Sequence, residues 1–321
     1  MASEELKWFH SYLSDRHHYV YYNNAYSTQK KITCGVPQGS ILGPLLFLIY
    51  INDLPRCNNH LKTIMFADDC TLYCSHNNIY TLTVTINNHL NQVSQWLKAN
   101  KLTLNLDKTN YIIFHRHKKF TYPVPPIKLN NSILNEVKHT KFLGITIQQQ
   151  LHWHKHIQHV KDKIAKQCGI LYLIRDFLNI KSLITIYYSL VYSNLLYCQT
   201  IWGAASKEAL NPLKIIQKRV IRTIARLRKR EHTNNTFHHY RLLKLEDINK
   251  VTSVVFVYKC LHGLIDNDNY FIRNDNTTYN MRNNHLLKLP QMSSFQSHTN
   301  IDTMEQIYLM TYLLIFRINQ R

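Results

Sequence analysis

The period of the hydrophobic pattern changes near residue 150, and this change limits the chain to folds in which a sheet and a helical bundle form one after the other. Before that point, short apolar runs such as 63–67 and 111–114 are typical of strands. From Trp153 to about Arg230, apolar residues recur three, four and seven positions apart, which predicts helices packed on one face. Strands followed by helices indicate an α+β fold. We expect three segments: 1–150, 151–230 and 231–321, the last comprising a linker, a helical connection and a poorly patterned tail.

Besides a helix that apolar spacing indicates at residues 4–15, two helices are expected within the first segment. Residues 45–51 are apolar on every side, which predicts a fully buried helix. A Gly/Pro loop at 35–40 precedes it, with Ser40 placed to cap its first turn. The second helix is indicated by a single apolar stripe: Leu82, Ile86, Leu90, Val93 and Leu97. Further extended runs are expected at 18–22, which a turn at Asn23-Asn24 returns toward Ile32, and at 102–106, 127–129 and 142–147.

The charge of the chain favours a polyanionic partner. Lys and Arg total 39 against 19 Asp and Glu, a formal net charge of +20. Nucleic acid is the first such partner to consider. The apolar run from Ile41 to Ile51 contains Pro44 and is too short to span a bilayer, so we expect no membrane partner.

The seven cysteines are odd in number and scattered, which is not typical of a disulfide framework. No CxxC pair suggests a zinc site. We therefore expect buried, unreactive thiols in an intracellular reducing compartment, either nucleus or cytoplasm.

Two adjacent carboxylates, Asp68 and Asp69, separate the apolar runs 63–67 and 70–74 and are expected to form a two-residue turn. Carboxylates beside a core are costly unless something compensates their charge. A divalent metal does so, since Mg²⁺ is bound by one or two carboxylates plus substrate phosphates. The plainer alternative is a solvated hairpin tip, although Asp-Asp lacks the Asn or Gly that such turns prefer. Spacing alone leaves both open.

Three motifs resemble, in order and spacing, the reverse transcriptases of jockey-type non-LTR elements. They are Gly35-Val36-Pro37-Gln38-Gly39-Ser40-Ile41-Leu42-Gly43-Pro44, then Tyr50-Ile51-Asn52-Asp53-Leu54-Pro55, then Phe66-Ala67-Asp68-Asp69. Downstream, Asn105 with Lys108 and Thr109, and then Lys141-Phe142-Leu143-Gly144-Ile145, are similar to the next two motifs of that family. The resemblance runs from about Trp8 to beyond Arg222.

The resemblance implies a partial polymerase palm, an antiparallel sheet with packed helices, followed by an all-helical thumb. Asp68 and Asp69 would hold Mg²⁺ or Mn²⁺, and Lys108 would lie near the triphosphate leaving group. Template and nucleotide contacts would come from Gly35, Pro37, Gln38, Gly39 and Ser40, and the turn that holds the primer end from Phe142, Leu143 and Gly144. The implied partners are an RNA template, a DNA primer and deoxynucleoside triphosphates, with no obligate protein partner. A solvated turn lysine and a core phenylalanine are the plain alternatives for Lys108 and Phe142.

The family pattern also has a third carboxylate, on a strand that precedes the helix containing Trp8. Glu4, Glu5 and Asp15 lie on or beside a helix-like segment, and Asp53 matches an Asp that the family carries outside its metal site. We therefore expect a palm that begins partway through its sheet, and a chain that by itself does not polymerise. The alternatives are a non-catalytic nucleic-acid-binding remnant and a maturase-like RNA-binding protein.

A basic segment between Leu213 and Arg230 contains eight Lys and Arg residues and no acid. Successive cations four residues apart move about 40° around a helix, which predicts a basic stripe that winds gently across one side. We expect nucleic-acid backbone contacts from Lys214, Lys218, Arg222 and Arg226, since uninterrupted positive charge repels itself unless phosphates neutralise it. A solvated helical face is the alternative.

Overall fold

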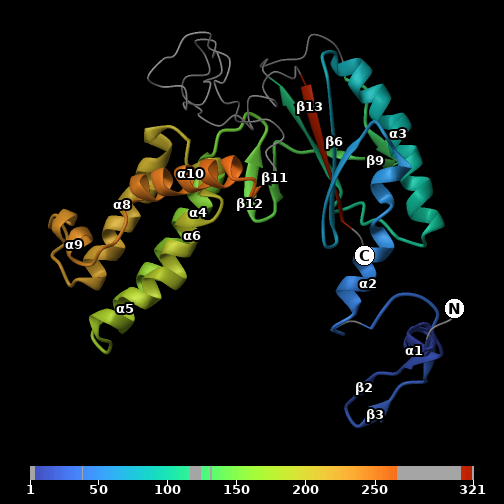
Figure 1. The fold of residues 1–321 in the computed structure, drawn as a ribbon, viewed down its shortest axis with the longest axis horizontal. Coiled ribbons are helices and arrows are strands. Elements are labelled where there is room, and N and C mark those ends of the chain that lie inside the picture. The colour runs from blue at the N-terminus through green and yellow to red at the C-terminus, as the bar shows by residue number, and fades with distance from the viewer. Residues whose placement is uncertain (1–3, 38, 116–123, 131, 266–311, 320–321) are drawn as a thin grey trace.

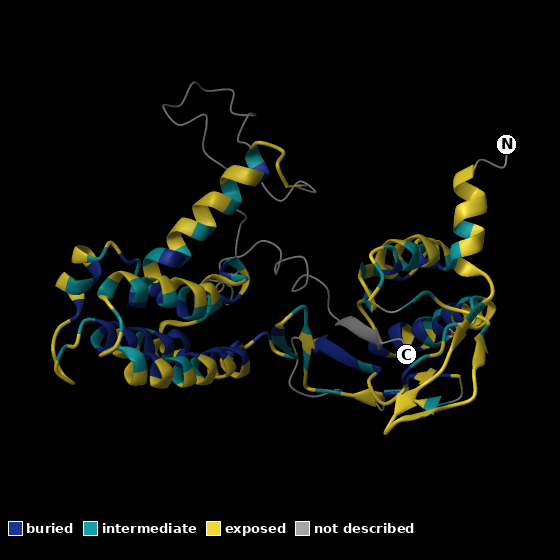
Figure 2. Cartoon of the chain, turned by 90° about the horizontal axis from the view of Figure 1, so that it is seen from below, coloured by how far each residue is buried: buried dark blue, intermediate teal, exposed yellow. Residues whose placement is uncertain are grey.

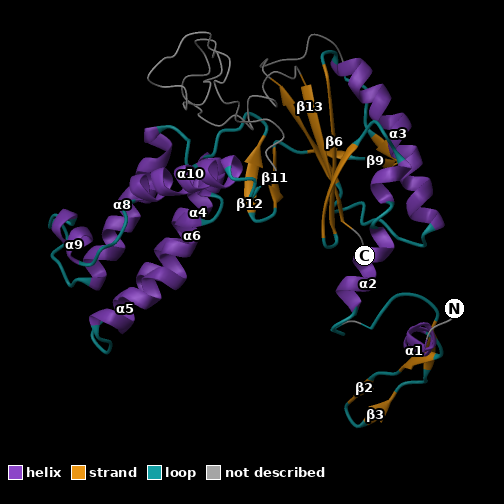
Figure 3. Cartoon of the chain, in the orientation of Figure 1, coloured by secondary structure: helices purple, strands orange, loops and turns teal. Residues whose placement is uncertain are grey.

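The computed structural model describes residues 4–37, 39–115, 124–130, 132–265 and the backbone of 312–319. The strands and some of the helices form one half of the molecule, and the other half is built of helices (Figure 3). This arrangement confirms the α+β class. Each half buries its own hydrophobic residues, seen as two dark interiors in Figure 2. No helix within the described residues is both long and apolar enough to span a bilayer.

The N-terminal part is a helix followed by a small, exposed hairpin (Figures 1 and 2). Its elements are α1 (Glu4–Leu13), β1 (Arg16–His18), β2 (Tyr21–Tyr22), β3 (Ala25–Tyr26) and β4 (Lys30–Ile32). β1 pairs antiparallel with β4, and β2 with β3. Asn23 and Asn24 both have positive φ, 50° and 58°, as a tight hairpin turn requires, so the predicted turn is confirmed. None of the α1 side chains is buried.

A five-stranded sheet forms the centre of the first half (Figure 1). Its strands are β5 (Lys62–Phe66), β6 (Asp69–His76), β7 (Asn110–His115), β10 (Asn135–Glu136) and β13 (Tyr312–Asn319). The order is β10-β7-β13-β6-β5, and all pairs are antiparallel except β10 with β7. The expectation that strands end before residue 150 was wrong, because β13 lies in the middle of this sheet. Its apolar run has no period that separates a buried strand from a buried helix.

The long helix α3 (Ile79–Ala99) connects β6 to β7 and packs on one face of the sheet. All five residues of the predicted stripe are buried, which confirms the helix and its inward face. They pack with Cys70 and Leu72 of β6 and with Tyr111 and Ile113 of β7. Asn78 caps the helix by accepting hydrogen bonds from the N–H groups of Tyr80 and Thr81.

The helix α2 (Gly43–Ile51) differs from its prediction. Only Gly43 and Ile51 are buried, whereas the side chains of Leu45 and Ile49 are 54% and 65% exposed. The helix therefore packs on the core along one line, through Phe47 and Ile51. An all-apolar pattern shows that a helix tolerates burial on every side, but it does not supply the neighbours that would bury it. Residues 102–106 also differ, since Leu104 alone makes a bridge and Leu106 is exposed.

Short elements complete the first half and join it to the second. They are the 3₁₀ turn η1 (Leu54–Cys57), β8 (Lys128–Leu129), β9 (Ser132–Ile133), β11 (His139–Phe142) and β12 (Ile145–Gln148). β8 pairs with β9 and β11 with β12, both antiparallel. The extended run expected at 142–147 is thus divided by a turn, with its two parts on different strands.

The second half is helical, as expected. Its elements are α4 (His154–Ile174), α5 (Ile180–Ile186), the π-helical turn η2 (Tyr187–Tyr192), α6 (Ser193–Leu196), α7 (Gln199–Trp202), α8 (Lys207–Ile224), α9 (Asn234–His239) and α10 (Leu245–Leu261). Tyr187, Trp202 and Leu213 are completely buried in its core. Part of the predicted linker forms α9, because Phe237 enters that core.

All seven cysteines are free. Cys70, Cys168 and Cys260 are buried, as expected, whereas Cys34 is exposed and the other three are half-buried. Burial raises the pKa of the Cys70 and Cys74 thiols to about 12. Both thiols are therefore almost entirely protonated and poorly nucleophilic at neutral pH.

Candidate active site

The two carboxylates lie at the tip of the β5–β6 hairpin. Phe66 pairs with Asp69, so the turn consists of Ala67 and Asp68, and the predicted Asp68-Asp69 turn was wrong by one residue. This register places Cys70 and Leu72 toward the core that contains α3, and a shift by one residue would turn both to the opposite face of the sheet. It also forces Ala67 to a φ of 51°, which costs a non-glycine residue about 1–2 kcal/mol. Asp68 is exposed and Asp69 is half-buried.

The donor set at this tip fits a hard divalent cation. Carboxylate oxygens are the ligands that Mg²⁺ and Mn²⁺ prefer. Within the described part of the chain, however, no group of three or more His, Cys, Asp or Glu side chains is gathered closely enough to hold a metal. Asp53 has another role, since its Oδ2 accepts a hydrogen bond from Trp96 Nε1 at 3.3 Å. Asp68 and Asp69 would therefore share a cation with further ligands from a substrate.

The loop before α2 is held in shape by its backbone. Gly35 and Gly39 have φ of 81° and 79°, a region that favours glycine. Ser40 Oγ donates to the carbonyl of Pro37 at 2.8 Å and accepts the N–H of Gly43 at 3.1 Å. Ser40 thus accepts a hydrogen bond from the N–H of Gly43, the first residue of α2, and so caps the helix as predicted, although the N-cap position belongs to Leu42. Gln38 lies outside the described residues.

Glycine is also required at position 43, which begins α2. A Cβ there would lie 2.9 Å from Ser40 Oγ and 3.3 Å from the Pro37 carbonyl oxygen. The loop and the helix consequently approach each other as closely as their backbones permit. Arg16 fastens the other end of the loop by donating to the carbonyl of Gly35.

Lys108 lies in a tight turn at the same end of the sheet as the carboxylates. Arg317 of β13 pairs with both Thr71 and Asn110, so the first residue of β7 is level with the third residue of β6. The N–H groups of Lys108 and Thr109 both donate to the carbonyl of Asn105, at 3.1 and 3.0 Å, and the Lys108 side chain is exposed. The register therefore places one cation and two carboxylates at the same end of the sheet.

The turn between β11 and β12 consists of Leu143 and Gly144, with φ of 43° and 86°. Its carbonyl at Leu143 accepts a hydrogen bond of 2.5 Å from the Tyr197 hydroxyl, which comes from the helical half. Phe142 is half-buried beside it. A turn is thus present as predicted, although Phe142 belongs to β11, and its role at a primer end stays a prediction. Tyr197 has no local sequence signal that marks it, since its partner lies 54 residues away.

The basic segment does not form one stripe. α8 ends at Ile224, and Arg226 follows with a φ of 54°, so the expected helix to Arg230 was wrong. Lys214 forms an ion pair with Glu246 of α10. Arg222 Nε donates to the Glu231 carbonyl at 2.8 Å, and Arg226 donates to the Arg175 carbonyl at 2.7 Å.

Three of the four predicted cations are thus already bound by oxygens of the chain itself: Lys214 by a carboxylate, and Arg222 and Arg226 by backbone carbonyls. Lys218 is exposed on α8, and so is its neighbour Arg219, which the four-residue spacing omitted. Together with Lys207 at the start of the helix, they are cations that α8 presents to solvent without a side-chain hydrogen bond or ion pair in the described part of the chain.

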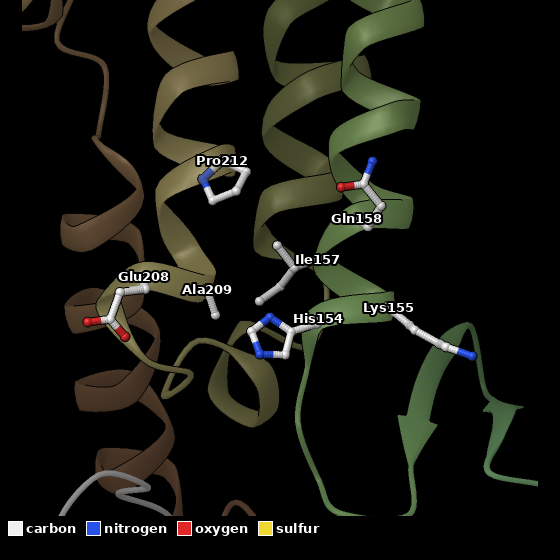
Figure 4. Close-up of a pocket in the computed structure, with 7 residues that line it drawn as sticks. All are labelled: His154, Lys155, Ile157, Gln158, Glu208, Ala209 and Pro212. Atoms are coloured by element: carbon white, nitrogen blue, oxygen red, sulfur yellow. The ribbon is translucent and has the colours of Figure 1, made fainter.

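A separate pocket of about 420 Å³ lies between the N-terminal ends of α4 and α8 (Figure 4). It is lined by His154, Lys155, Ile157, Gln158, Glu208, Ala209 and Pro212. The pocket belongs to the helical half and contains none of the predicted site residues.

Comparison with known proteins agrees with the motifs. Residues 1–147 match the family model described as reverse transcriptase (RNA-dependent DNA polymerase). The chain is 32% identical over 228 residues, 67% of its length, to a probable RNA-directed DNA polymerase from transposon BS of Drosophila melanogaster, of which it covers 25%. For the probable RNA-directed DNA polymerase from transposon X-element of the same species, the identity is 29% over 225 residues, 67% of this chain and 24% of the relative. The RNA-directed DNA polymerase from its mobile element jockey is 26% identical over 226 residues, again 67% and 24%.

The chain spans about a quarter of the length of these curated relatives. No solved structure matches it significantly. The family match covers residues 1–147, which include the Asp68-Asp69 tip. The chain therefore belongs to the reverse transcriptase family and is related to the enzymes of jockey-like non-LTR retrotransposons.

Proposed function

We propose that this chain is the palm and thumb portion of an RNA-directed DNA polymerase, which extends a DNA primer along an RNA template from deoxynucleoside triphosphates. The sheet half would be the palm and the helices from α4 onward the thumb. One observation carries the proposal beyond the family match: β6, which begins at Asp69, and β7, which begins two residues after Lys108, both start at the same end of the sheet. Carboxylates that can bind a metal and a lysine that can offset phosphate charge, at one end of a sheet, suit a metal-bound triphosphate.

In this proposal the chain supplies the following groups. Asp68 and Asp69 would hold Mg²⁺ or Mn²⁺, which when bound would stabilise the charge that develops on the transferred phosphoryl group. Lys108 would offset charge on the pyrophosphate leaving group. The loop containing Gly35, Pro37, Gln38, Gly39 and Ser40 would present backbone groups to the template and the nucleotide.

The primer end would rest against the turn of Phe142, Leu143 and Gly144. Tyr197 supports that turn through its hydrogen bond to Leu143, so a thumb residue would fix the position of a palm turn. The duplex backbone would contact Lys218 and Arg219, which are exposed on α8. Lys214, Arg222 and Arg226 would contribute less, because each already has a partner within the chain.

We further propose that the 321-residue chain does not extend a primer by itself. Two-metal chemistry holds its ions about 3.5–4 Å apart, and carboxylates from one turn do not fix that separation. The expected result is no incorporation with a homopolymer RNA template, a DNA primer and Mg²⁺ or Mn²⁺. Incorporation by the wild type that disappears in Asp68→Ala but persists in Asp162→Ala, an exposed control on α4, would show this to be wrong.

The metal assignment has its own test. Mn²⁺ titration followed by electron paramagnetic resonance should detect a weak site that Asp68→Asn and Asp69→Asn each weaken at least tenfold and Asp162→Asn does not. Binding that is unchanged in all three variants would remove the metal from this tip. It would favour the second candidate, a nucleic-acid-binding protein without catalysis, which the exposed cations Lys218 and Arg219 of α8 support.

A further inference from the structure

The sheet has one strand position between β6 and β7. Both strands pair antiparallel with β13, so they run parallel to each other, and α3 makes the crossover between them. Neighbouring strands lie about 4.8 Å apart, so β6 and β7 are roughly 9.6 Å apart, too far to pair directly. An empty position would leave the inner backbone groups of both strands without partners.

The groups at this position are deeply buried. Cys70 and Leu72 of β6 are each 1% exposed, and Ile112 and Ile113 of β7 are 0% exposed. Unsatisfied N–H and C=O groups at such depth cost about 1–3 kcal/mol each. These exposures include the cover that β13 itself provides, and pairing with β13 supplies the partners that the inner backbone groups of both strands would lack in an empty position.

β13 matches the position along its whole length. It pairs with β6 over eight successive residues, from Tyr312 opposite His76 to Asn319 opposite Asp69. It pairs with β7 over six, from Tyr312 to Arg317. Its sequence, Tyr-Leu-Leu-Ile-Phe-Arg-Ile-Asn, is largely apolar, and its polar residues Arg317 and Asn319 lie at the end near the Asp68-Asp69 tip. A continuous apolar run is what a central strand covered on both faces requires.

We propose that β13 is an intrachain blocking strand. It occupies the sheet position beside the Asp68-Asp69 tip, and its last residue, Asn319, pairs with Asp69. A strand that ends in a carboxylate would bring a third ligand to the pair from this position, and β13 excludes such a strand. The occupation of the position stands independently, whereas the effect on metal binding rests on the proposed function.

Two native cysteines make the occupation testable. Leu314 is opposite Cys74 and Ile318 is opposite Cys70. Directly opposite residues in antiparallel strands have Cα atoms about 4.5–5.5 Å apart, within the range that a disulfide spans. Of the two thiols, Cys74 is half-buried and more accessible than Cys70.

The experiment uses the full chain carrying Leu314→Cys, oxidised with copper-phenanthroline because burial raises the pKa of the Cys74 thiol to about 12 and slows air oxidation. Mass spectrometry should identify a Cys74–position 314 disulfide in monomeric protein. Leu313→Cys is the matched control, since position 313 is opposite Ser75 and alternate residues point to opposite faces. Leu314→Cys in a Cys74→Ser background should form no such bond.

Three results would overturn the occupation: no disulfide at position 314, equal formation at positions 313 and 314, or a disulfide found only in dimers. The last would show that a second copy supplies the strand. None of these results involves metal or nucleotide, so they leave the polymerase proposal unaffected.

The consequence for the carboxylates is tested by Asn319→Asp, which places an acid opposite Asp69. Mn²⁺ affinity should rise about tenfold or more, and Asp69→Asn in the same chain should abolish the gain. Asn135→Asp is the control, because it adds the same charge on β10, three strand positions from β6. An equal affinity for Asn319→Asp and the wild type, or an equal gain from Asn135→Asp, would refute the blocking role at this turn.

Discussion

The hydroxyl of Tyr197 donates a hydrogen bond of 2.5 Å to the carbonyl oxygen of Leu143, which joins the helical half to the β11–β12 turn. The acceptor belongs to a residue whose φ is 43°, so the bond supports a strained turn. The Tyr197 ring also lies against Gly144. One tyrosine thus restrains both residues of the turn proposed to hold the primer end.

Tyr197→Phe removes only this hydroxyl. We expect a loss of about 1 kcal/mol in the free energy of unfolding, the usual net value of one hydrogen bond. Urea denaturation followed by circular dichroism measures it. Tyr188→Phe, also a partly exposed tyrosine of the helical half, is the control and should change little. Equal effects of the two substitutions would show that the bond contributes nothing specific.

Gly144→Ala should destabilise the protein by about 1–2 kcal/mol. Its φ is 86°, and the added Cβ would lie 3.3 Å from Tyr197 Cε1. Gly169→Ala on α4 provides the contrast, since a Cβ there meets nothing within 4 Å and alanine favours a helix by roughly 0.5–1 kcal/mol. The two substitutions should therefore shift the urea midpoint in opposite directions. A shift in the same direction would contradict the turn geometry.

Stability should fall as the pH decreases from about 6.5 to about 4. The His156 side chain is 3% exposed and packs edge-on against Trp202, and its Nδ1 lies 3.4 Å from the Thr146 amide. Burial, with a smaller contribution from the nearby His159, lowers the pKa of His156 to about 4. Within this window the unfolded chain binds a proton that the folded chain does not, so acid favours unfolding by up to about 1.4 kcal/mol per pH unit.

Above pH 6.5, His156 is neutral in both states and contributes no pH dependence. Unfolding free energies measured at pH 7.5 and 5.0 test this, with His156→Gln expected to lose less stability on acidification than the wild type. His154→Gln, at the exposed start of α4, should behave as the wild type does. Equal acid sensitivity in all three proteins would exclude His156 as the source.

Binding to an RNA–DNA duplex should weaken steeply with salt, and Lys218 and Arg219 should account for part of that slope. Each cation that neutralises a phosphate contributes about 0.9 to the slope of log K against log salt for B-form DNA. Replacing both by Gln should reduce the slope by roughly 1–2, as measured by fluorescence anisotropy at several salt concentrations. Lys214→Gln is the control, since Lys214 is paired with Glu246. An unchanged slope in the double variant would remove α8 from the interface.

Elements with a strong local signal were predictable. The stripe from Leu82 to Leu97 specified α3 and its inward face, because helical period and burial agree along its whole length. The turns at Asn23-Asn24 and Leu143-Gly144 contain Asn or Gly residues, which adopt positive φ more readily than others do, whereas Leu143 is held at its φ of 43° against that preference. The motifs around Asp68 and Asp69 indicated the family relationship, because the order and spacing of motif residues can be compared between sequences without knowledge of the fold.

By itself, then, the sequence determined the α+β class, the long helix and the family. Only the tertiary structure decided which residue begins β6, which cations of the basic segment are already paired, and which strand lies beside Asp69. The physical reason is common to all three: they depend on partners far away in the chain, such as Glu246 for Lys214 and β13 for β6. Local periodicity reports what a segment prefers to bury, but the identity of its neighbour is set by the packing of the whole chain.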